Sequence, residues 1–233
     1  MAIRGVLFDT GDTLTRPIGG RWNPRFDFEE VLLRHVPDAP SHRFAEAFAA
    51  GQRLLDESPT TPPRDDYHRA ILAELGITNA PRSILEDLDR PLEVPHVEPF
   101  PDVRGVLEEL RARAIRMAIV TDNWGDAETV KRKHDRIGLE GFFEAFVVSS
   151  ELGCNKPDAR MYRAASDALG LQPAECLYVD DDPALVGAAL ALGYRGAAIC
   201  REGPPPAGEI RVISRLEELI PLIARSQLPG TGA

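Results

Sequence analysis

The amino-acid sequence predicts an α/β protein with a doubly wound parallel sheet at its core and an inserted α-helical domain. In the second half of the chain, short apolar runs alternate with patterns of helical spacing, as in strand–helix–strand units joined by right-handed crossovers. Between residues 15 and 100 only helical spacing occurs. We therefore expect a core domain of residues 1–14 and 101–225, a helical domain of residues 15–100, and a flexible tail of residues 226–233.

The first strand is expected where an apolar run ends at Phe8, and Asp9 follows it directly. Residues 10–13, Thr-Gly-Asp-Thr, are of types that favour turns. In an open parallel sheet, ligands bind at the carboxyl ends of the strands. The sequence therefore predicts Asp9 at that edge, although the same residues also suit an ordinary turn with no chemical role.

Four helices are expected in the inserted segment, because apolar side chains recur there every three or four residues. They cover Phe28–Val36, Phe44–Leu55, Tyr67–Leu75 and, with a weaker pattern, Ile84–Leu88. Proline-rich stretches at Pro59–Pro63 and Pro91–Pro101 mark breaks between elements. No alternating pattern typical of strands occurs in this segment.

The second half of the chain supplies the remaining strands of the predicted sheet. Apolar runs place them at Arg116–Thr121, Ala145–Ser149, Cys176–Asp180 and Ala197–Cys200. Helical spacing places the intervening helices at Asp102–Leu110, Asp126–Ile137, Ala159–Leu169 and after Pro183. A last helix is expected to open with the capping-box sequence Ser214-Arg215-Leu216-Glu217. Short connections favour helices on both faces of the sheet, with the strand that ends at Asp9 in its centre.

Composition excludes several classes of protein. With 43% hydrophobic and 27% charged residues, the chain is typical of a globular protein rather than a disordered one. A formal net charge of −10 argues against a nucleic-acid partner, which would require a basic surface. No apolar run approaches the ~18 residues of a membrane span, and no secretion signal precedes the first strand. Because the three cysteines also fit a reducing compartment, we expect a cytoplasmic protein without a membrane partner. The oligomeric state stays open.

Three further segments place polar side chains at or near expected strand ends. They are Thr121-Asp122-Asn123, the loop with Lys156-Pro157-Asp158, and Asp180-Asp181-Asp182. Each has an ordinary explanation by itself: a helix cap, a surface lysine and an acidic helix N-terminus. Lysine, however, occurs only at positions 131, 133 and 156. Together with Asp9, these segments predict one site for phosphoryl transfer.

The expected chemistry follows from the residue types. Asp9 can act as a nucleophile that forms an aspartyl-phosphate and divides the transfer into two steps. Its carboxylate and those of Asp180 and Asp181 would repel one another without a cation between them, and oxygen ligands of this kind suit Mg²⁺. We therefore predict a magnesium site that includes Asp9, Asp180 and Asp181.

A second group of residues is expected to bind the phosphate of the substrate. The hydroxyl of Thr121 and the amides of Asp122 and Asn123 can donate hydrogen bonds to the oxygens that are not transferred. The ammonium of Lys156 offsets the negative charge of Asp9 and of the phosphate. Thr121 and Lys156 are thus predicted to be both phosphate-binding and catalytic.

The ordered set of motifs resembles that of the haloacid dehalogenase superfamily of hydrolases. The four motifs of that superfamily match Asp9 with Thr13, then Thr121, Lys156 and the pair Asp180-Asp181. The resemblance extends to about Leu219. It implies a Rossmann-like core whose inserted segment is an α-helical cap that closes over the site and selects substrates. It also implies that the backbone carbonyl of Gly11 joins Asp9 and Asp180 as a metal ligand.

One position departs from the pattern of the superfamily. Its phosphatases carry a second aspartate two residues after the nucleophile, which acts as general acid and base, whereas this chain has Gly11 there. Such a group contributes ~10²–10⁴-fold to the rate. Asp12, one residue later, is the candidate to replace it as a catalytic acid.

Three functions follow from these observations. We expect a Mg²⁺-dependent hydrolase that acts on a small phosphorylated metabolite, a phosphate monoester, through an aspartyl-phosphate at Asp9. The alternatives are a haloacid dehalogenase that uses Asp9 without a metal, and a catalytically weakened binding or regulatory member of the superfamily. Phosphonoacetaldehyde-type cleavage is disfavoured, because residues 15–100 contain no lysine for a Schiff base. The sequence identifies neither the substrate nor the roles of Trp22, Trp124 and the arginines of the insert.

Overall fold

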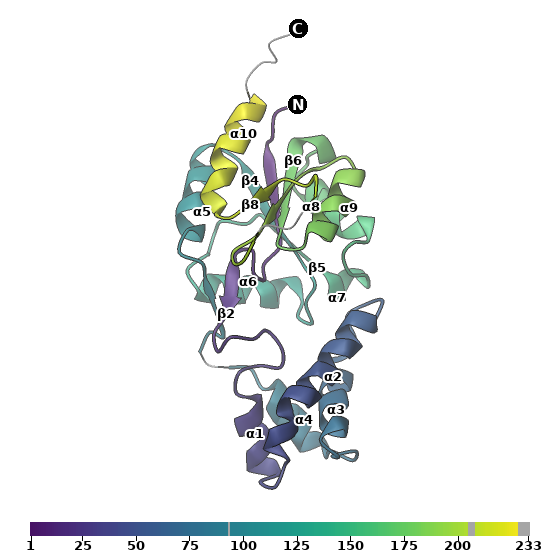
Figure 1. Cartoon of the computed structure of the whole chain (residues 1–233). Coiled ribbons are helices and arrows are strands. Elements are labelled where there is room, and N and C mark those ends of the chain that lie inside the picture. The colour runs from purple at the N-terminus through teal and green to yellow at the C-terminus, as the bar shows by residue number, and fades with distance from the viewer. Residues whose placement is uncertain (93, 205–207, 228–233) are drawn as a thin grey trace. The chain divides into compact units, whose positions relative to one another are not determined.

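The computed structural model describes residues 1–92, 94–204 and 208–227, which form two compact units (Figure 1). The first unit contains Met1–Arg16 and the described residues from Pro99 onward, and the second contains Pro17–Glu98. The predicted domain limits, residues 15 and 100, lie two residues from these boundaries. Of the expected tail, residues 226 and 227 belong to the last helix, α10 (Leu219–Gln227), and residues 228–233 lie outside the described part of the chain.

A six-stranded parallel sheet forms the centre of the first unit. Its strands run in the order β5-β4-β1-β6-β7-β8, and the neighbouring strands pair in parallel. They are β1 (Gly5–Phe8), β4 (Arg116–Thr121), β5 (Ala145–Val148), β6 (Cys176–Asp180), β7 (Arg195–Ile199) and β8 (Val212–Ile213). The predicted α/β sheet is confirmed. The strand that ends before Asp9 lies inside it, between β4 and β6.

Both faces of the sheet are buried, which explains why its strands read as continuous apolar runs. Val6 and Phe8 of β1 pack into one layer of the core and Leu7 into the other, as the two-residue period of a strand requires. The first layer includes side chains of α5 (Val103–Ala112), α6 (Ala127–Arg136) and α10, and the second includes those of α8 (Ala159–Ala168) and α9 (Pro183–Ala191). Helices on both faces make the sheet doubly wound (Figure 1).

The second unit is helical between residues 25 and 90, a fully described range that contains no strand. Its helices are α1 (Phe28–His35), α2 (Phe44–Glu57), α3 (Arg64–Glu74) and α4 (Arg82–Asp89). Helices α2 and α3 pack closely at Gly51, where a Cβ atom would lie 2.8 Å from side-chain atoms of both Tyr67 and Ile71. The four helices expected from the apolar stripes are all present.

Four short strands and helices do not follow from the sequence pattern. Strands β2 (Thr15–Pro17) and β3 (Val97–Pro99) form a second, two-stranded sheet, β8 is the sixth strand of the main sheet, and α7 (Ser149–Leu152) is one helical turn directly after β5. Segments of two to four residues are too short to show either period clearly. Only their surroundings in the folded chain define them.

The chain enters its last helix through a cap that differs from the expected one. A 3₁₀ turn (Leu216–Glu218) precedes α10. Glu218, and not Glu217, accepts hydrogen bonds from the amides of Ser214 (2.9 Å) and Arg215 (3.1 Å). The tighter turn thus moves the acceptor by one residue. No helix in the described ranges, α10 included, has the length and apolar character needed to cross a membrane.

Leu107 of α5 tests the packing of the first layer of the core. Its side chain is completely buried there. Leu107→Ala removes buried methyl groups and leaves a cavity, so we expect the free energy of unfolding to fall by about 2–5 kcal/mol. Leu190→Ala on α9, where the residue is 40% exposed, is the matched control and should change that free energy by less than about 0.5 kcal/mol. Urea denaturation followed by circular dichroism measures both. Equal losses in the two variants would contradict the packing.

Candidate functional site

Lys156 lies between two carboxylates at the carboxyl edge of the sheet. Its ammonium Nζ is 2.6 Å from Oδ1 of Asp9 and 3.0 Å from Oδ2 of Asp180. All three side chains are buried, with 4% of Lys156, 10% of Asp9 and 1% of Asp180 exposed. Buried charges of this kind persist only when they are paired. The structure thus brings together three of the predicted site residues.

The pairing of strands explains why these three residues lie close together. The amide of Asp9 donates to the carbonyl of Val179 (2.9 Å) and continues the pairing of β1 with β6, so Asp9 lies beside Asp180. Lys156 comes from the loop between α7 and α8. Its amide donates to Oδ1 of Asp122 (3.2 Å), directly after β4. Asp122 therefore holds the lysine loop in place, and its predicted contact with phosphate stays a prediction.

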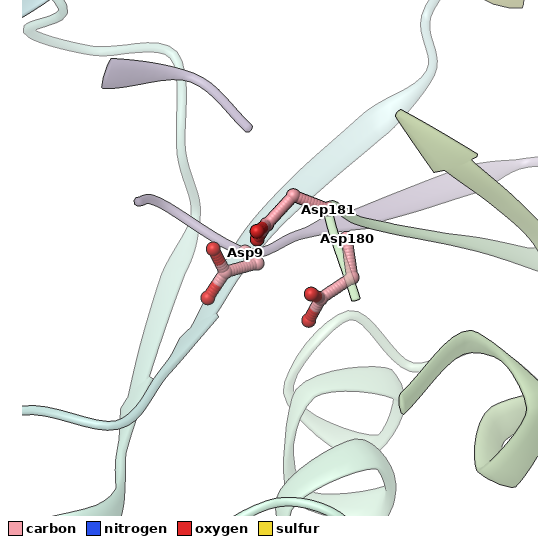
Figure 2. Close-up of side chains that lie close together, drawn as sticks. All are labelled: Asp9, Asp180 and Asp181. Carbon is pink, nitrogen blue, oxygen red and sulfur yellow. The ribbon is translucent and has the colours of Figure 1, made fainter. Parts of the chain in front are cut away.

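Three carboxylates share this edge, as Figure 2 shows. One oxygen from each of Asp9, Asp180 and Asp181 lies within 4.8 Å of the others. Burial raises the pKa of Asp9 from its usual 3.8 to about 7; the charges of Asp180 and Asp181 add to this effect, while Lys156 opposes it. Asp181 is exposed as a residue, but its carboxylate lies against those of Asp9 and Asp180. Loss of hydration there, followed by the charges of Asp180 and Asp12, raises the pKa of Asp181 to about 7 as well. The cluster therefore carries more negative charge than Lys156 offsets.

This donor set fits a divalent cation. Carboxylate oxygens are the hard ligands that Mg²⁺ prefers, and a double positive charge would balance what Lys156 leaves uncompensated. The carbonyl oxygen of Gly11, the fourth expected ligand, accepts a hydrogen bond from the amide of Thr13 (2.5 Å). A carbonyl has two lone pairs, so this bond leaves one available for a metal.

Asp180 is held by more partners than Lys156. The hydroxyl of Tyr178 donates to Oδ2 of Asp180, and the amide of Asp182 donates to Oδ1 (2.9 Å). Tyr178 is completely buried and lies two residues before Asp180, so the two side chains share one face of β6. Tyr178 was not among the predicted site residues, although its position two residues before Asp180 on an expected strand is a signal that could have identified it.

In the loop after Asp9, one backbone carbonyl accepts three hydrogen bonds. The carbonyl oxygen of Thr10 accepts hydrogen bonds from the amides of Leu14 (3.0 Å) and Thr15 (2.9 Å) and from the hydroxyl of Thr15 (3.1 Å). Thr15 is buried, and its two donors therefore find their acceptor inside the loop. These bonds fix residues 10–15 as one compact turn next to the predicted nucleophile.

Asp12, and not Gly11, takes the left-handed backbone angle of this turn, with φ of 49°. Aspartate adopts this conformation more readily than most residues. Asp12 is close enough to Asp181 for its charge to raise the pKa there. It does not belong to the group of carboxylates that converge with Asp9. Its role as a substitute acid stays a prediction.

Thr121 receives a hydrogen bond from a second threonine. Oγ1 of Thr10 donates to Oγ1 of Thr121 (2.9 Å). A hydroxyl that accepts this bond still has its own hydrogen to donate. Thr10 therefore orients the hydroxyl that is predicted to bind phosphate. Thr10 was not among the predicted site residues, because it contacts Thr121 only in the folded protein and no sequence pattern links two residues so far apart.

Asn123 is engaged within the loop that follows β4. Its amide donates to Oγ of Ser149 (3.1 Å), and its side-chain Oδ1 accepts a hydrogen bond from the amide of Gly125 (3.0 Å). An amide that already has an acceptor in the protein has less to offer a substrate oxygen. The structure thus gives Asn123 a part in shaping this loop, and its contact with phosphate stays a prediction.

Most of the chain matches one known family. The sequence model of the family described as "haloacid dehalogenase-like hydrolase" matches residues 3–193. This protein is a haloacid dehalogenase-like hydrolase. The assignment confirms the resemblance carried by the four motifs, and it makes the protein a hydrolase.

Relatives of this haloacid dehalogenase-like hydrolase include phosphatases and dehalogenases. It is 26% identical over 225 residues to phosphatase MT3486 of Mycobacterium tuberculosis (strain CDC 1551 / Oshkosh), with 94% of this chain and 98% of the relative covered. It is 29% identical over 236 residues to (S)-2-haloacid dehalogenase 4A of Burkholderia cepacia, with 97% and 96% covered. The crystal structure of 2-haloacid dehalogenase from Pseudomonas syringae pv. Tomato DC3000 has the same fold, with a TM-score of 0.70 and 23% identity over 96% of this chain and 99% of that one. Family membership therefore does not decide between the two chemistries.

The acidic cluster makes the stability of the metal-free protein depend on pH. The pKa of Asp181 is about 7 in the folded protein against the usual 3.8. The folded protein therefore retains a proton that the unfolded chain releases, and stability falls as the pH rises from about 4 to about 7. We expect Asp181→Asn to remove this cost. Its melting temperature in EDTA should exceed that of the wild type by a margin that grows from about pH 4 to a plateau above about pH 7.

Thermal unfolding in EDTA across this pH range measures the difference between the two proteins. The comparison with the variant is needed because His68 also titrates between about pH 4 and 7. Burial lowers the pKa of His68 from 6.5 to about 4, which makes stability rise with pH in this range. This contribution is the same in wild type and variant, so it cancels in their difference. Mg²⁺ should raise the melting temperature of the wild type more than that of Asp181→Asn. A variant that melts below the wild type at pH 8 in EDTA would contradict the assigned electrostatics.

Proposed function

We propose that this hydrolase is a Mg²⁺-dependent phosphatase that acts on a small phosphate monoester through an aspartyl-phosphate at Asp9. The observation that carries the proposal is the convergence of Asp9, Asp180 and Asp181 within 4.8 Å next to one ammonium, that of Lys156. Mg²⁺ bound by these carboxylates and the carbonyl of Gly11 would supply positive charge for the phosphoryl oxygens.

Charge balance favours a cation at this site. A phosphate monoester is itself an anion, and a like charge 4 Å away opposes its approach by about 4 kcal/mol at an effective dielectric constant of about 20. Lys156 offsets only one of the three carboxylates. The charges of a divalent cation, Lys156 and the three carboxylates sum to zero, so an anionic substrate can approach Asp9 once the cation is bound.

Asp9, Lys156 and Thr121 have different roles in the proposed reaction. In the first step, an oxygen of Asp9 forms a bond to phosphorus while the bond from phosphorus to the leaving oxygen breaks. Lys156 stabilises the ionised form of Asp9 and offsets charge on the phosphoryl oxygens, and Thr121 donates its hydroxyl hydrogen to one of them. In the second step, water attacks phosphorus, inorganic phosphate leaves, and the carboxylate of Asp9 is restored.

The absence of an acid at Gly11 favours a second candidate, haloacid dehalogenation. A departing halide needs no proton, and one relative of this chain is a haloacid dehalogenase. Asp9 would then attack carbon, release halide, and be regenerated when water hydrolyses the resulting ester. The charge of the cluster argues against dehalogenation, because without a metal Lys156 would offset only one of the three carboxylates that an anionic substrate would meet.

A paired assay separates the two functions. The purified protein is tested for phosphate release from p-nitrophenyl phosphate and from sugar, nucleotide and small organic phosphates, and for halide release from 2-haloacids. Each reaction is run with Mg²⁺ and with EDTA. We expect phosphate release that requires Mg²⁺, and no halide. Halide release that is insensitive to EDTA would establish the dehalogenase instead, and inactivity in both assays would favour a binding or regulatory protein.

Asp9→Asn tests the nucleophile. An amide cannot form the acyl phosphate, so we expect turnover of p-nitrophenyl phosphate to fall at least ~10³-fold, with the circular dichroism spectrum of a folded protein. Asp167→Asn, at an exposed position of α8, is the matched control and should keep wild-type turnover. Activity retained in Asp9→Asn would exclude the covalent role of Asp9.

Dependence on the leaving group tests the missing acid. The wild type should hydrolyse aryl phosphates much faster than alkyl phosphates, because a phenolate departs without protonation. Gly11 is not among the glycines with a positive φ, so its backbone angle does not oppose a side chain, and Gly11→Asp should raise turnover of alkyl phosphates by up to ~10²-fold.

Asp12→Asn decides whether Asp12 is the displaced acid. A loss of ~10²-fold on alkyl phosphates, with Mg²⁺ binding preserved, would assign that role to Asp12. Equal wild-type rates on alkyl and aryl phosphates, together with no loss in Asp12→Asn, would show that the substitution at Gly11 has no catalytic consequence.

A further inference from the structure

The guanidinium of Arg201 joins segments of the first unit that are far apart in the sequence. Nη1 is 2.6 Å from Oδ2 of Asp102, and Nη2 donates to the carbonyl oxygen of Thr13 (2.6 Å). The guanidinium carbon lies 4.2 Å from the centre of the Phe100 ring. Oδ2 of Asp102 also accepts a hydrogen bond from the amide of Leu216 (2.7 Å). The side chains of Arg201 and Asp102 are each only 10% exposed, so this network is part of the interior.

The network holds both chain segments that lead to and from the helical unit. Thr13 lies just before β2, whereas Phe100 and Asp102 lie just after β3. The two segments are also bonded directly, since the amide of Phe100 donates to the carbonyl of Leu14 (3.0 Å). Arg201 thus attaches the turn that follows Asp9 to the C-terminal part of the core.

Stability alone does not account for this network. Nε of Arg201, Oδ1 of Asp102 and Oγ1 of Thr13 are buried without a hydrogen-bond partner among the described residues, and each such atom costs free energy. A buried ion pair is often no more stabilising than an apolar pair of the same volume. The distinctive contribution of Arg201 is geometric. Its planar guanidinium holds two N–H donors at a fixed angle, and these fix the position of the Thr13 carbonyl relative to the Asp102 carboxylate.

We propose that Arg201 is a positioning residue for the reaction at Asp9. By holding the carbonyl of Thr13, it fixes the turn of residues 10–15, which carries the hydroxyl of Thr10 and the carbonyl of Gly11. Arg201 itself contacts neither Asp9 nor the group of converging carboxylates. A displacement of about 1 Å in such a turn can slow a reaction by about 10²-fold. The effect on catalysis rests on the proposed phosphatase function, whereas the effect on the turn does not.

The main test is the double variant Arg201→Met/Asp102→Asn. It removes both charges, so neither is left buried and unpaired, and the asparagine keeps an acceptor for the amide of Leu216. Hydrogen–deuterium exchange of the full chain is followed in peptides that cover residues 9–16. The amides of Leu14 and Thr15 report on the turn, because they donate to the carbonyl of Thr10. We expect their exchange to be about tenfold faster than in the wild type, while peptides from α8 are unchanged.

A control removes another, more exposed arginine ion pair from the same unit. Arg116 and Glu144 form a pair at 2.6 Å, and Arg116 begins β4, at the edge of the sheet opposite the site. Arg116→Met/Glu144→Gln should leave the exchange of residues 9–16 at the wild-type rate. Faster exchange of that peptide in both double variants would overturn the proposal, since any lost ion pair would then loosen the turn.

Kinetics with p-nitrophenyl phosphate and Mg²⁺ form the second readout. A positioning role predicts that kcat of the Arg201→Met/Asp102→Asn variant falls about 10–100-fold with little change in KM, because Lys156 and Thr121 still bind the phosphate. Arg201→Lys, which offers a point charge in place of a fork, should have an intermediate kcat. A variant that raises KM at constant kcat would overturn the proposal.

The two readouts separate failure of this proposal from failure of the proposed function. Unchanged exchange of residues 9–16 in the Arg201→Met/Asp102→Asn variant would overturn the positioning role, and so would faster exchange spread evenly from α5 to α10, which marks a general loss of stability. If the wild type releases no phosphate, the proposed function fails, and the exchange of the turn decides the role of Arg201 by itself.

Discussion

Lys156 places one ammonium within 3.0 Å of two buried carboxylates, Asp9 and Asp180, and the arrangement of the site depends on this contact. Without the ammonium, two like charges would face each other in the interior, where water cannot screen them. The amide of Lys156 is bonded in turn to Asp122, so the same residue ties together the ends of β1, β4 and β6. The pairing of Lys156 with the two carboxylates and the position of the Lys156 loop therefore depend on each other.

The parallel sheet explains why that contact forms at its carboxyl edge. Both faces of the sheet are covered by helices, so a polar side chain within a strand is buried and needs a partner there. At the ends of β1 and β6, Asp9 and Asp180 become neighbours through parallel pairing in register. Asp181, one residue later, is exposed and adds a third carboxylate to the group. The fold thus concentrates negative charge at the carboxyl edge of the sheet, where ligands bind in open parallel sheets.

The chemistry of the site is set by what surrounds the nucleophile as much as by Asp9 itself. Haloacid dehalogenase-like hydrolases with different substrates share this fold, so the scaffold alone does not choose a reaction. In this protein the choice depends on two local features that oppose each other. The charge of the carboxylate cluster favours a metal ion and a phosphate, whereas Gly11 withholds the acid that an alkyl leaving group needs.

The sequence by itself determined the order of the longer strands and helices and the place of Asp9, Lys156 and Asp180 at strand ends or in the adjoining loop. Apolar periodicity and position after a strand are local properties, so they can be recognised before the chain is folded. The tertiary structure alone decided that Tyr178 holds Asp180 and that Thr10 orients the hydroxyl at the end of β4. These hydrogen bonds, like those of Arg201, depend on how strands and loops pack against one another. A hydrogen bond between segments that are distant in the sequence produces no periodic pattern of residues, so only the folded chain reveals it.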